Sequence, residues 1–214
     1  MDAARIADLL APFLAGDTLT AAQLDQLARY LDLLLRWNAR INLTAVRDPE
    51  QIVTRHFGES LFAARTLLPP PAGLQVHDFG SGAGFPGLPI KIWAPAARVT
   101  LIESQNKKQA FLGEAIRLLA LSGVDIFPGR AEDLTTTAHL VTLRAVEKFE
   151  RALPLAARLV SPGGRLALLI GARQEPLARN LASHLQWSKA VPVPLSDARI
   201  LLVGRNPGGD VSDQ

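Results

Sequence analysis

A glycine-rich segment in the middle of the chain has the residue types of a nucleotide-binding loop. It reads DFGSGAGFPGLP over residues 78–89. Read from Gly82, it matches the GxGxxG fingerprint of dinucleotide-binding proteins, and read from Asp78 it is DxGxGxG, which is typical of methyl-donor sites. Glycines let the chain turn sharply and let a flat ligand approach the backbone, which both ligands require. The segment therefore predicts a nucleotide-type ligand, and the neighbouring residues must identify it.

Acidic and proline residues around this segment favour a methyl donor over a dinucleotide. Glu103 lies 19 residues beyond Gly84, where a carboxylate can accept both ribose hydroxyls, which NAD and S-adenosylmethionine each carry. Asp78 suits a ligand with an ammonium and a sulfonium group and would repel a pyrophosphate. Pro86 and Pro89 offer no backbone N–H in the first helical turn, where a pyrophosphate would bind. These features predict S-adenosylmethionine, with an NAD(P)-dependent oxidoreductase as the alternative.

A short polar segment, GRAEDL over residues 129–134, follows a predicted strand. Its carboxylate and backbone groups lie where an adenosyl site would read the adenine amino group and ring nitrogen. The same segment also suits the start of a helix, because Glu132 and Asp133 interact favourably with the helix dipole. Both roles can hold at once.

Several residue types that other reactions need are missing from the sequence. There is no cysteine, which excludes a thiolate nucleophile and the covalent route to carbon-5 of a pyrimidine. The four scattered histidines form no recognised metal motif, so no metal ligand is predicted. No Asn/Asp-Pro-Pro-Tyr/Phe motif is present to hold an exocyclic amino group. An acceptor with a free lone pair that loses no proton, such as guanine N7, needs only proximity and alignment. No catalytic residue is therefore assigned.

The composition is that of a globular protein with one domain. The chain has 214 residues, of which 48% are hydrophobic and 20% charged. Its net charge of +3 permits an RNA partner but is equally typical of a solvated surface. No apolar run is long enough to span a membrane, and residues 1–16 have the pattern of an amphipathic helix rather than a signal peptide. A cytoplasmic location is expected, since the lack of cysteine is compatible with it.

Hydrophobic spacing divides the chain into a helical part and an α/β part. Residues 1–68 are predicted to form a helical cap within the same globular unit, with a capping box at Thr20 and Gln23 and a helix starting at Asp48. A proline-rich linker covers residues 67–73, and residues 74–206 form the second part. There, strands alternate with helices, which predicts a mostly parallel sheet with helices on both faces.

The predicted strands are 74–80, 98–103, 124–127, 140–143 and 165–170, with a helix over 107–121. Segments 190–194 and 198–204 have no long helical pattern between them, so we expect them to pair as a hairpin that adds an antiparallel strand. This ending is usual in methyltransferase folds. Residues 207–214 are expected to be disordered.

Six motifs occur in an order that resembles the ribosomal RNA small-subunit methyltransferase G family, formerly the glucose-inhibited division protein B family. They are RWNARINLT (36–44), RHFGESL (55–61), DFGSGAGFPGLP (78–89), ESQNKKQAFL (103–112), GRAE (129–132) and LRAV (143–146). The resemblance implies a Rossmann-like class I methyltransferase fold and S-adenosylmethionine-dependent methylation of N7 of guanine 527 in 16S rRNA, with S-adenosylhomocysteine as product. Two positions differ from the common family pattern, since Glu59 stands in place of aspartate and Leu143 in place of serine.

The resemblance also assigns roles to residues of this sequence. It implies that Gly80, Phe85, Ala131, Glu132 and Arg144 contact the cofactor and that Glu103 binds its ribose. Together with the other loop residues, the predicted cofactor site consists of Asp78, Gly80, Gly82, Gly84, Phe85, Glu103, Ala131, Glu132 and Arg144.

The basic residues give weaker indications of RNA contact. Lys107 and Lys108 open the helix after Glu103, so a phosphate contact and a plain solvated pair are equally compatible with the sequence. Arg55 can pair with Glu59 at i,i+4, which favours a structural role. The candidate RNA-binding residues are Asn42, His56, Lys107, Lys108 and Arg199. The expected partner of this monomer is 16S rRNA, either free, in the 30S subunit or in an assembly intermediate. A non-catalytic rRNA-binding assembly factor is a further alternative.

Overall fold

The N-terminal part of the computed structural model, which describes residues 1–67, 74–146 and 148–208, is helical. It consists of α1 (Ala3–Leu14), α2 (Ala21–Asn38), α3 (Pro49–Ile52), the π-helical η1 (Val53–Gly58) and α4 (Glu59–Leu67). The predicted capping box is confirmed: the Gln23 amide donates to the Thr20 hydroxyl at 3.3 Å, and the Thr20 amide donates to the Gln23 side chain at 2.9 Å. The helix expected to start after Asp48 is present but is divided by the π-helical turn of η1.

The strands form one mixed sheet in the order β3-β2-β1-β4-β5-β8-β6, with β7 also paired to β8. They are β1 (Gln75–Phe79), β2 (Arg98–Ile102), β3 (Val124–Phe127), β4 (Ala138–Arg144), β5 (Val160–Gly171), β6 (Gln186–Trp187), β7 (Val191–Pro192) and β8 (Arg199–Arg205). β1 to β5 pair in parallel, and β8 runs antiparallel to β5. The predicted α/β class, the mostly parallel sheet and the C-terminal antiparallel strand are therefore confirmed.

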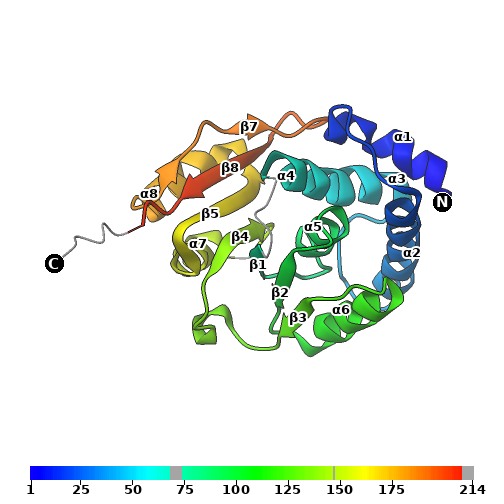
Figure 1. The fold of residues 1–214 in the computed structure, drawn as a ribbon, viewed down its shortest axis with the longest axis horizontal. Helices are drawn as coiled ribbons and strands as arrows, with labels where there is room; N and C mark the ends of the chain where they lie inside the picture. The colour runs from blue at the N-terminus through cyan, green and yellow to red at the C-terminus, as the bar shows by residue number, and fades with distance from the viewer. Residues whose placement is uncertain (68–73, 147, 209–214) are drawn as a thin grey trace.

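Helices cover both faces of this sheet (Figure 1). They are α5 (Gly87–Trp93), α6 (Asn106–Leu118), η2 (Ala131–Asp133), α7 (Phe149–Arg158), η3 (Ala172–Gln174) and α8 (Glu175–Leu181). One core cluster joins the N-terminal helices to α5 and α6 through residues such as Leu34, Phe57 and Phe111, and a second lies under α7 and α8 around Leu153 and Ala178. The N-terminal helices thus share a hydrophobic core with one face of the sheet.

Three details differ from the sequence-based expectation or lie beyond it. The two-residue strand β6 was not predicted. β5 begins at Val160 rather than 165, and its register against β4 shifts between Ala138 and Leu140, so the intervening residues of β5 form an irregular strand segment. Residues 68–73 of the expected linker and 209–214 of the expected tail lie outside the described residues.

Candidate active site

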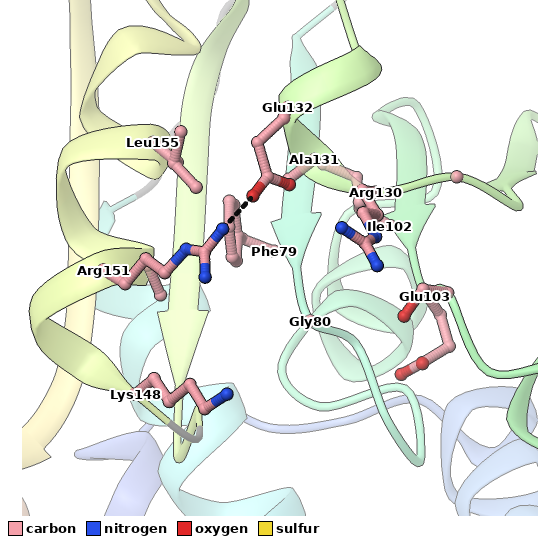
Figure 2. A pocket seen from close by; sticks show the side chains of 13 residues that line it. Phe79, Gly80, Ile102, Glu103, Arg130, Ala131, Glu132, Lys148, Arg151 and Leu155 are labelled. Carbon is pink, nitrogen blue, oxygen red and sulfur yellow. Dashed lines mark ion pairs between the residues drawn. The ribbon is translucent and has the colours of Figure 1, made fainter.

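A cavity of about 330 Å³ opens at the carboxyl ends of β1 and β2 (Figure 2). The order of strands reverses beside β1, because β2 pairs on one side and β4 on the other, and open α/β sheets bind ligands at such a point. The cavity is lined by Phe79, Gly80, Ile102, Glu103, Ser104, Gly129, Arg130, Ala131, Glu132, Lys148, Arg151, Ala152 and Leu155. Four of the predicted cofactor residues, Gly80, Glu103, Ala131 and Glu132, are thus brought together.

The glycine loop between β1 and α5 has a backbone that side chains would disturb. Gly80, Gly82 and Gly84 have φ angles of +68°, +57° and +87°, a region that glycine adopts readily. A Cβ on Gly84 would lie 2.6 Å from the hydroxyl oxygen of Tyr30 and also 2.6 Å from Leu88 Cδ1. The loop therefore needs glycine at Gly84 both for its conformation and for its close packing against α2.

Glu103, directly after β2, ties this loop to the edge of the cavity. Its Oε2 accepts the amide of Gly82 at 3.0 Å, and its Oε1 accepts the amide of Gln105 at 2.8 Å. The residue is only 6% exposed. A carboxylate has about four acceptor positions, so Glu103 can still accept further hydroxyl groups on the cavity side.

The opposite wall of the cavity combines apolar and charged side chains. Ala131 is buried on the short helix η2, and Ile102 and Leu155 add apolar surface. The Glu132 carboxylate faces Arg151 of α7 at 3.8 Å (Figure 2). An adenosyl group fits this lining, because a purine packs on apolar walls while its ribose hydroxyls bind a carboxylate.

Asp78, which the sequence predicted as a cofactor-binding residue, lies beneath the loop and is not among the residues that line the cavity. Its side chain is fully buried, and its Oδ1 accepts the Thr142 hydroxyl at 2.7 Å while its Oδ2 accepts the Gly87 amide at 3.2 Å. Burial raises the pKa of Asp78 to about 6, although these hydrogen bonds oppose the shift. Asp78 therefore supports the loop and the start of α5 from below.

The N-terminus of α5 has no free amide for a pyrophosphate. The amide of Gly87 is taken by Asp78, the amide of Leu88 donates to the Gly84 carbonyl at 2.8 Å, and Pro86 and Pro89 carry no N–H. A helix N-terminus binds phosphate only through such amides. The geometry thus disfavours the dinucleotide alternative and supports the choice made from the same prolines in the sequence.

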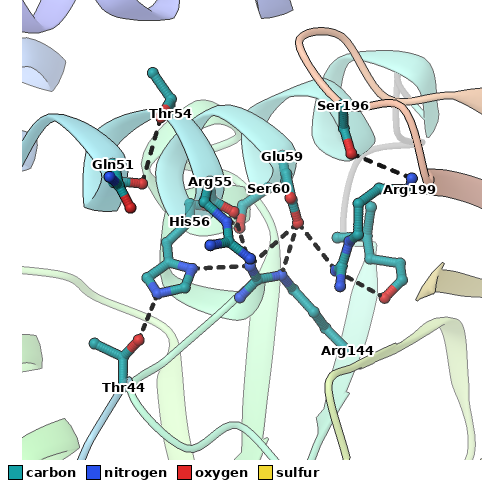
Figure 3. A network of polar contacts seen from close by, with 11 residues as sticks. Thr44, Gln51, Thr54, Arg55, His56, Glu59, Ser60, Arg144, Ser196 and Arg199 are labelled. Carbon is teal, nitrogen blue, oxygen red and sulfur yellow. Dashed lines mark hydrogen bonds and ion pairs between the residues drawn. The ribbon is translucent and has the colours of Figure 1, made fainter. Parts of the chain in front are cut away.

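Behind the glycine loop lies a buried ionic network centred on Glu59 (Figure 3). Its Oε2 accepts hydrogen bonds from Arg144 at 3.1 Å and from Arg199 at 3.0 Å. Arg144 also donates to the carbonyl of Arg55 at 2.7 Å, and its guanidinium carbon lies 5.9 Å from the centre of the Phe85 ring. The expected pairing of Arg55 with Glu59 is wrong, because residues from two strands reach Glu59 instead.

His56, a candidate for RNA contact in the sequence, belongs to this network. Its ring nitrogens lie 2.8 Å from the Arg144 guanidinium and 2.7 Å from the Thr44 hydroxyl, and only 8% of the residue is exposed. Burial and the charge of Arg144 lower the pKa of His56 to about 3. A neutral imidazole with both nitrogens bonded connects protein groups and cannot attract a phosphate at neutral pH.

The remaining predicted residues lie around the cavity rather than in its lining. Phe85 is buried and stacks on Tyr30, with ring centres 5.4 Å apart. Arg199 is partly buried and holds Glu59, while Asn42 and Lys107 are exposed. Gly82 and Gly84 belong to the glycine loop itself, Arg144 lies behind it, and Lys108 is partly exposed.

Sequence reasoning missed several residues of the site. Arg130, Lys148 and Arg151 place cations on the cavity lining, and Tyr30 donates a buried hydrogen bond to the carbonyl of Ala83 in the loop. Arg130 lies inside a recognised motif and could have been singled out. Tyr30 and Arg151 are far from the loop in sequence, and only the packing of α2 and α7 brings them to it.

Neither a metal site nor a membrane-spanning helix is found in the part of the chain that the structure describes. Residues 1–67, 74–146 and 148–208 contain no group of three or more His, Cys, Asp or Glu side chains placed to hold a metal ion. The helices within these residues include none that is long and apolar enough to cross a membrane.

The sheet order and the acid-flanked glycine loop define a class I methyltransferase fold. TYW2 of Pyrococcus horikoshii, solved in complex with MeSAdo, superposes with a TM-score of 0.58 at 16% identity over 70% of this chain and 62% of that one. TYW2 of M. jannaschii in complex with AdoMet gives a TM-score of 0.58 at 16% identity over 78% of each chain. At these identities the likeness shows the fold alone.

The chain belongs to the rRNA small subunit methyltransferase G family, whose model matches residues 23–199. It is 37% identical over 192 residues to the ribosomal RNA small subunit methyltransferase G of Stenotrophomonas maltophilia, covering 89% of each protein. The proteins of that name from Xanthomonas axonopodis and Streptococcus thermophilus are 42% and 39% identical, over 74% and 82% of this chain and 74% and 78% of their own lengths. The predicted family is therefore confirmed.

Proposed function

We propose that this protein transfers the methyl group of S-adenosylmethionine to N7 of a guanine, guanine 527, in 16S rRNA of the small ribosomal subunit. The observation that carries the proposal is the position of Glu103. It follows β2, is held by the glycine loop, and faces a cavity whose far wall contains Ala131 and Glu132. In a member of a small-subunit rRNA methyltransferase family, this arrangement supports an adenosyl-containing methyl donor.

Each wall of the cavity has a proposed role in holding the cofactor. Glu103 accepts the ribose hydroxyls, the backbone around Ala131 and Glu132 reads the adenine, and the exposed backbone at Gly80 leaves room for the amino-acid part. When bound, S-adenosylmethionine supplies a methyl group activated by its sulfonium. Arg144 and the loop residue Phe85 act as positioning residues, since Arg144 is held by Glu59 and lies against the Phe85 ring from behind the loop.

The acceptor is proposed from the chemistry that the lining offers. The two lining carboxylates among the described residues are engaged, Glu103 with two amides and Glu132 with Arg151. The neighbouring Asp78 and His56 are buried, with their polar atoms bonded to protein groups. Such a site suits an acceptor that loses no proton during methyl transfer. Guanine N7 meets this requirement, and the enzyme then contributes proximity and alignment.

Substitution of Glu103 tests the proposal at the cofactor. Glu103→Gln keeps the shape of the side chain but removes its charge, so we expect S-adenosylmethionine to bind at least tenfold more weakly by calorimetry, because hydrogen bonds to a charged group contribute about 1.5–3 kcal/mol. Asp125→Asn, an exposed carboxylate on the neighbouring strand β3, is the matched control and should bind normally. Unchanged affinity in Glu103→Gln, or wild-type protein that binds NAD(P)H instead, would overturn the assignment.

A further inference from the structure

The surface cations of the described chain fall into two groups. Four surface arginines, Arg5, Arg29, Arg65 and Arg179, each have a carboxylate within 2.7–2.9 Å. A second group has no carboxylate within 4.0 Å among residues 1–67, 74–146 and 148–208. It includes five cations in the last turn of α2, in the loop after it and in the first turn of α6, and we call them the cap patch: Arg36, Arg40, Arg47, Lys107 and Lys108.

The packing of α2 against α6 brings these residues together. The Gln26 side chain near the start of α2 donates to the carbonyl of Leu119, just after α6, at 2.8 Å. Near the other end, Trp37 Nε1 donates to Glu114 Oε2 at 2.9 Å. The two helices are therefore neighbours (Figure 1), and the C-terminal end of α2 lies beside the middle of α6, where the Trp37 and Phe111 rings are 5.8 Å apart. Lys107 and Lys108 open α6 directly after Glu103, so this part of the cap patch lies on the same edge of the sheet as the cavity.

The loop that carries Arg40 and Arg47 is held in one conformation. The Asn38 side chain accepts the amides of Leu43 and Thr44, each at 3.0 Å. The Thr44 hydroxyl bonds His56, which in turn contacts Arg144 behind the glycine loop (Figure 3). The backbone that carries Arg40 and Arg47 is thus fixed by hydrogen bonds. The contacts from Thr44 through His56 to Arg144 connect it to the residues behind the glycine loop.

We propose that the cap patch binds the phosphate backbone of the ribosomal RNA and orients it toward the cavity. The net charge of the whole chain is only +3, whereas these five cations have no carboxylate within 4.0 Å among the described residues and are available to an anionic partner. Unpaired Arg and Lys side chains bind phosphates independently of base sequence and fix the register of the nucleic acid. This inference rests on the proposed function for the identity of its partner. It assigns RNA binding largely to the helical cap, outside the cavity lining.

The test compares charge-removing double variants on the two edges of the sheet. Arg36→Gln with Arg40→Gln and, separately, Lys107→Gln with Lys108→Gln neutralise the cap patch. Arg98→Gln with Arg205→Gln removes two exposed cations on the amino edge, away from the cavity, and is the matched control. Binding to protein-free 16S rRNA and to 30S subunits is measured by filter retention at several salt concentrations, and cofactor affinity by calorimetry.

We expect each cap-patch variant to lower the slope of log Kd against log salt by about 1.4–1.8, the value for two lost phosphate contacts. Cofactor affinity should equal that of the wild type, which shows that the variants are folded. An unchanged slope in both cap-patch variants, or an equal loss in the control, would overturn the inference. So would weakened binding to 30S subunits with normal binding to protein-free RNA, since that result indicates a protein partner. The filter-retention assay measures RNA binding and does not require methyl transfer. If the wild type bound RNA but transferred no methyl group, that result would contradict the proposed function and not this inference.

Discussion

The carboxylate of Glu59 accepts hydrogen bonds from two arginines that come from different strands, β4 and β8. The side chains of Glu59 and Arg144 are only 5% and 8% exposed, so this is a buried ion pair. Buried pairs contribute little net stability, but breaking one leaves an uncompensated charge in the interior. The remaining bonds of Arg144 to the Arg55 carbonyl and to His56 therefore satisfy groups that burial would otherwise penalise.

His56 makes the folding stability depend on pH in a predictable direction. Its pKa of about 3 in the folded protein is below the usual 6.5, so the unfolded chain binds more protons between these values. The free energy of unfolding should therefore fall as pH falls through this window. Between pH 7.5 and 5, the wild type should lose about 2 kcal/mol more than His56→Gln in urea unfolding.

The control for this measurement is the exposed His184. His184→Gln should show the same pH dependence as the wild type. If His56→Gln also loses as much stability as the wild type on acidification, His56 is not held neutral by the network, and the connection from Thr44 to Arg144 is not as described.

Tyr30 should stabilise the glycine loop through its hydroxyl. The hydroxyl donates to the carbonyl of Ala83, and both groups are buried. Tyr30→Phe keeps the ring stacked on Phe85 but leaves the carbonyl without this donor, which should cost about 1–3 kcal/mol in the free energy of unfolding. We also expect weaker S-adenosylmethionine binding by calorimetry, since the loop would lose its tie to α2.

Thr66→Ala is the matched control for Tyr30→Phe. It also removes one bond from a hydroxyl to a carbonyl, that of Phe62, but within α4 and away from the loop. Thr66→Ala should leave the affinity for S-adenosylmethionine unchanged. Equal cofactor affinity in wild type and Tyr30→Phe would mean that the loop keeps its conformation without α2.

At the scale of elements, α5 and α6 contain glycines for different reasons. A Cβ on Gly87, the first residue of α5, would lie 2.6 Å from Leu101 Cδ2 and 2.8 Å from Asp78 Oδ2. A Cβ on Gly113, inside α6, would lie 3.9 Å from both Arg117 Nη1 and Ile126 Cδ1, which is ordinary van der Waals contact. Gly87 is thus needed for close packing of α5 on β1 and β2, whereas Gly113 only weakens its helix.

Alanine at these two glycines should therefore have opposite effects on stability. Gly87→Ala should destabilise the protein by about 1–3 kcal/mol through overpacking, and it should displace the Asp78 side chain. Gly113→Ala should stabilise it by about 0.5–1 kcal/mol, because alanine has the higher helix propensity. Urea unfolding midpoints measure both effects, and a loss of stability in Gly113→Ala or a gain in Gly87→Ala would contradict the packing described here.

At the scale of the whole molecule, the strand pattern was predictable while the side-chain partners were not. The observed bounds of β3, Val124–Phe127, are those of the apolar run in the sequence. The antiparallel pairing of β8 with β7 followed from the short connection between the two segments. The partner residues of His56, by contrast, lie 12 and 88 positions away in the chain. Such distant pairs depend on how the cap packs on the sheet, which no local pattern encodes.

Asp78 shows the same limit at the candidate site. Its place near the end of a hydrophobic strand correctly indicated the carboxyl edge of the sheet, but the sequence did not show which way its side chain points. Thr142 on β4 and the amide of Gly87 draw it beneath the loop. Glu103, Ala131 and Glu132 do line the cavity, as a site at the ends of neighbouring parallel strands requires.

The proposed reaction can be tested by mapping the methylated nucleotide. Purified protein would be incubated with isotopically labelled S-adenosylmethionine and either 30S subunits or protein-free 16S rRNA from cells that lack this protein, and the digested RNA analysed by mass spectrometry. We predict label in a single 7-methylguanosine, at guanine 527, in at least one of the two substrates. Label on another base or another atom of guanine, or no label in either substrate while the protein binds S-adenosylmethionine, would contradict the account.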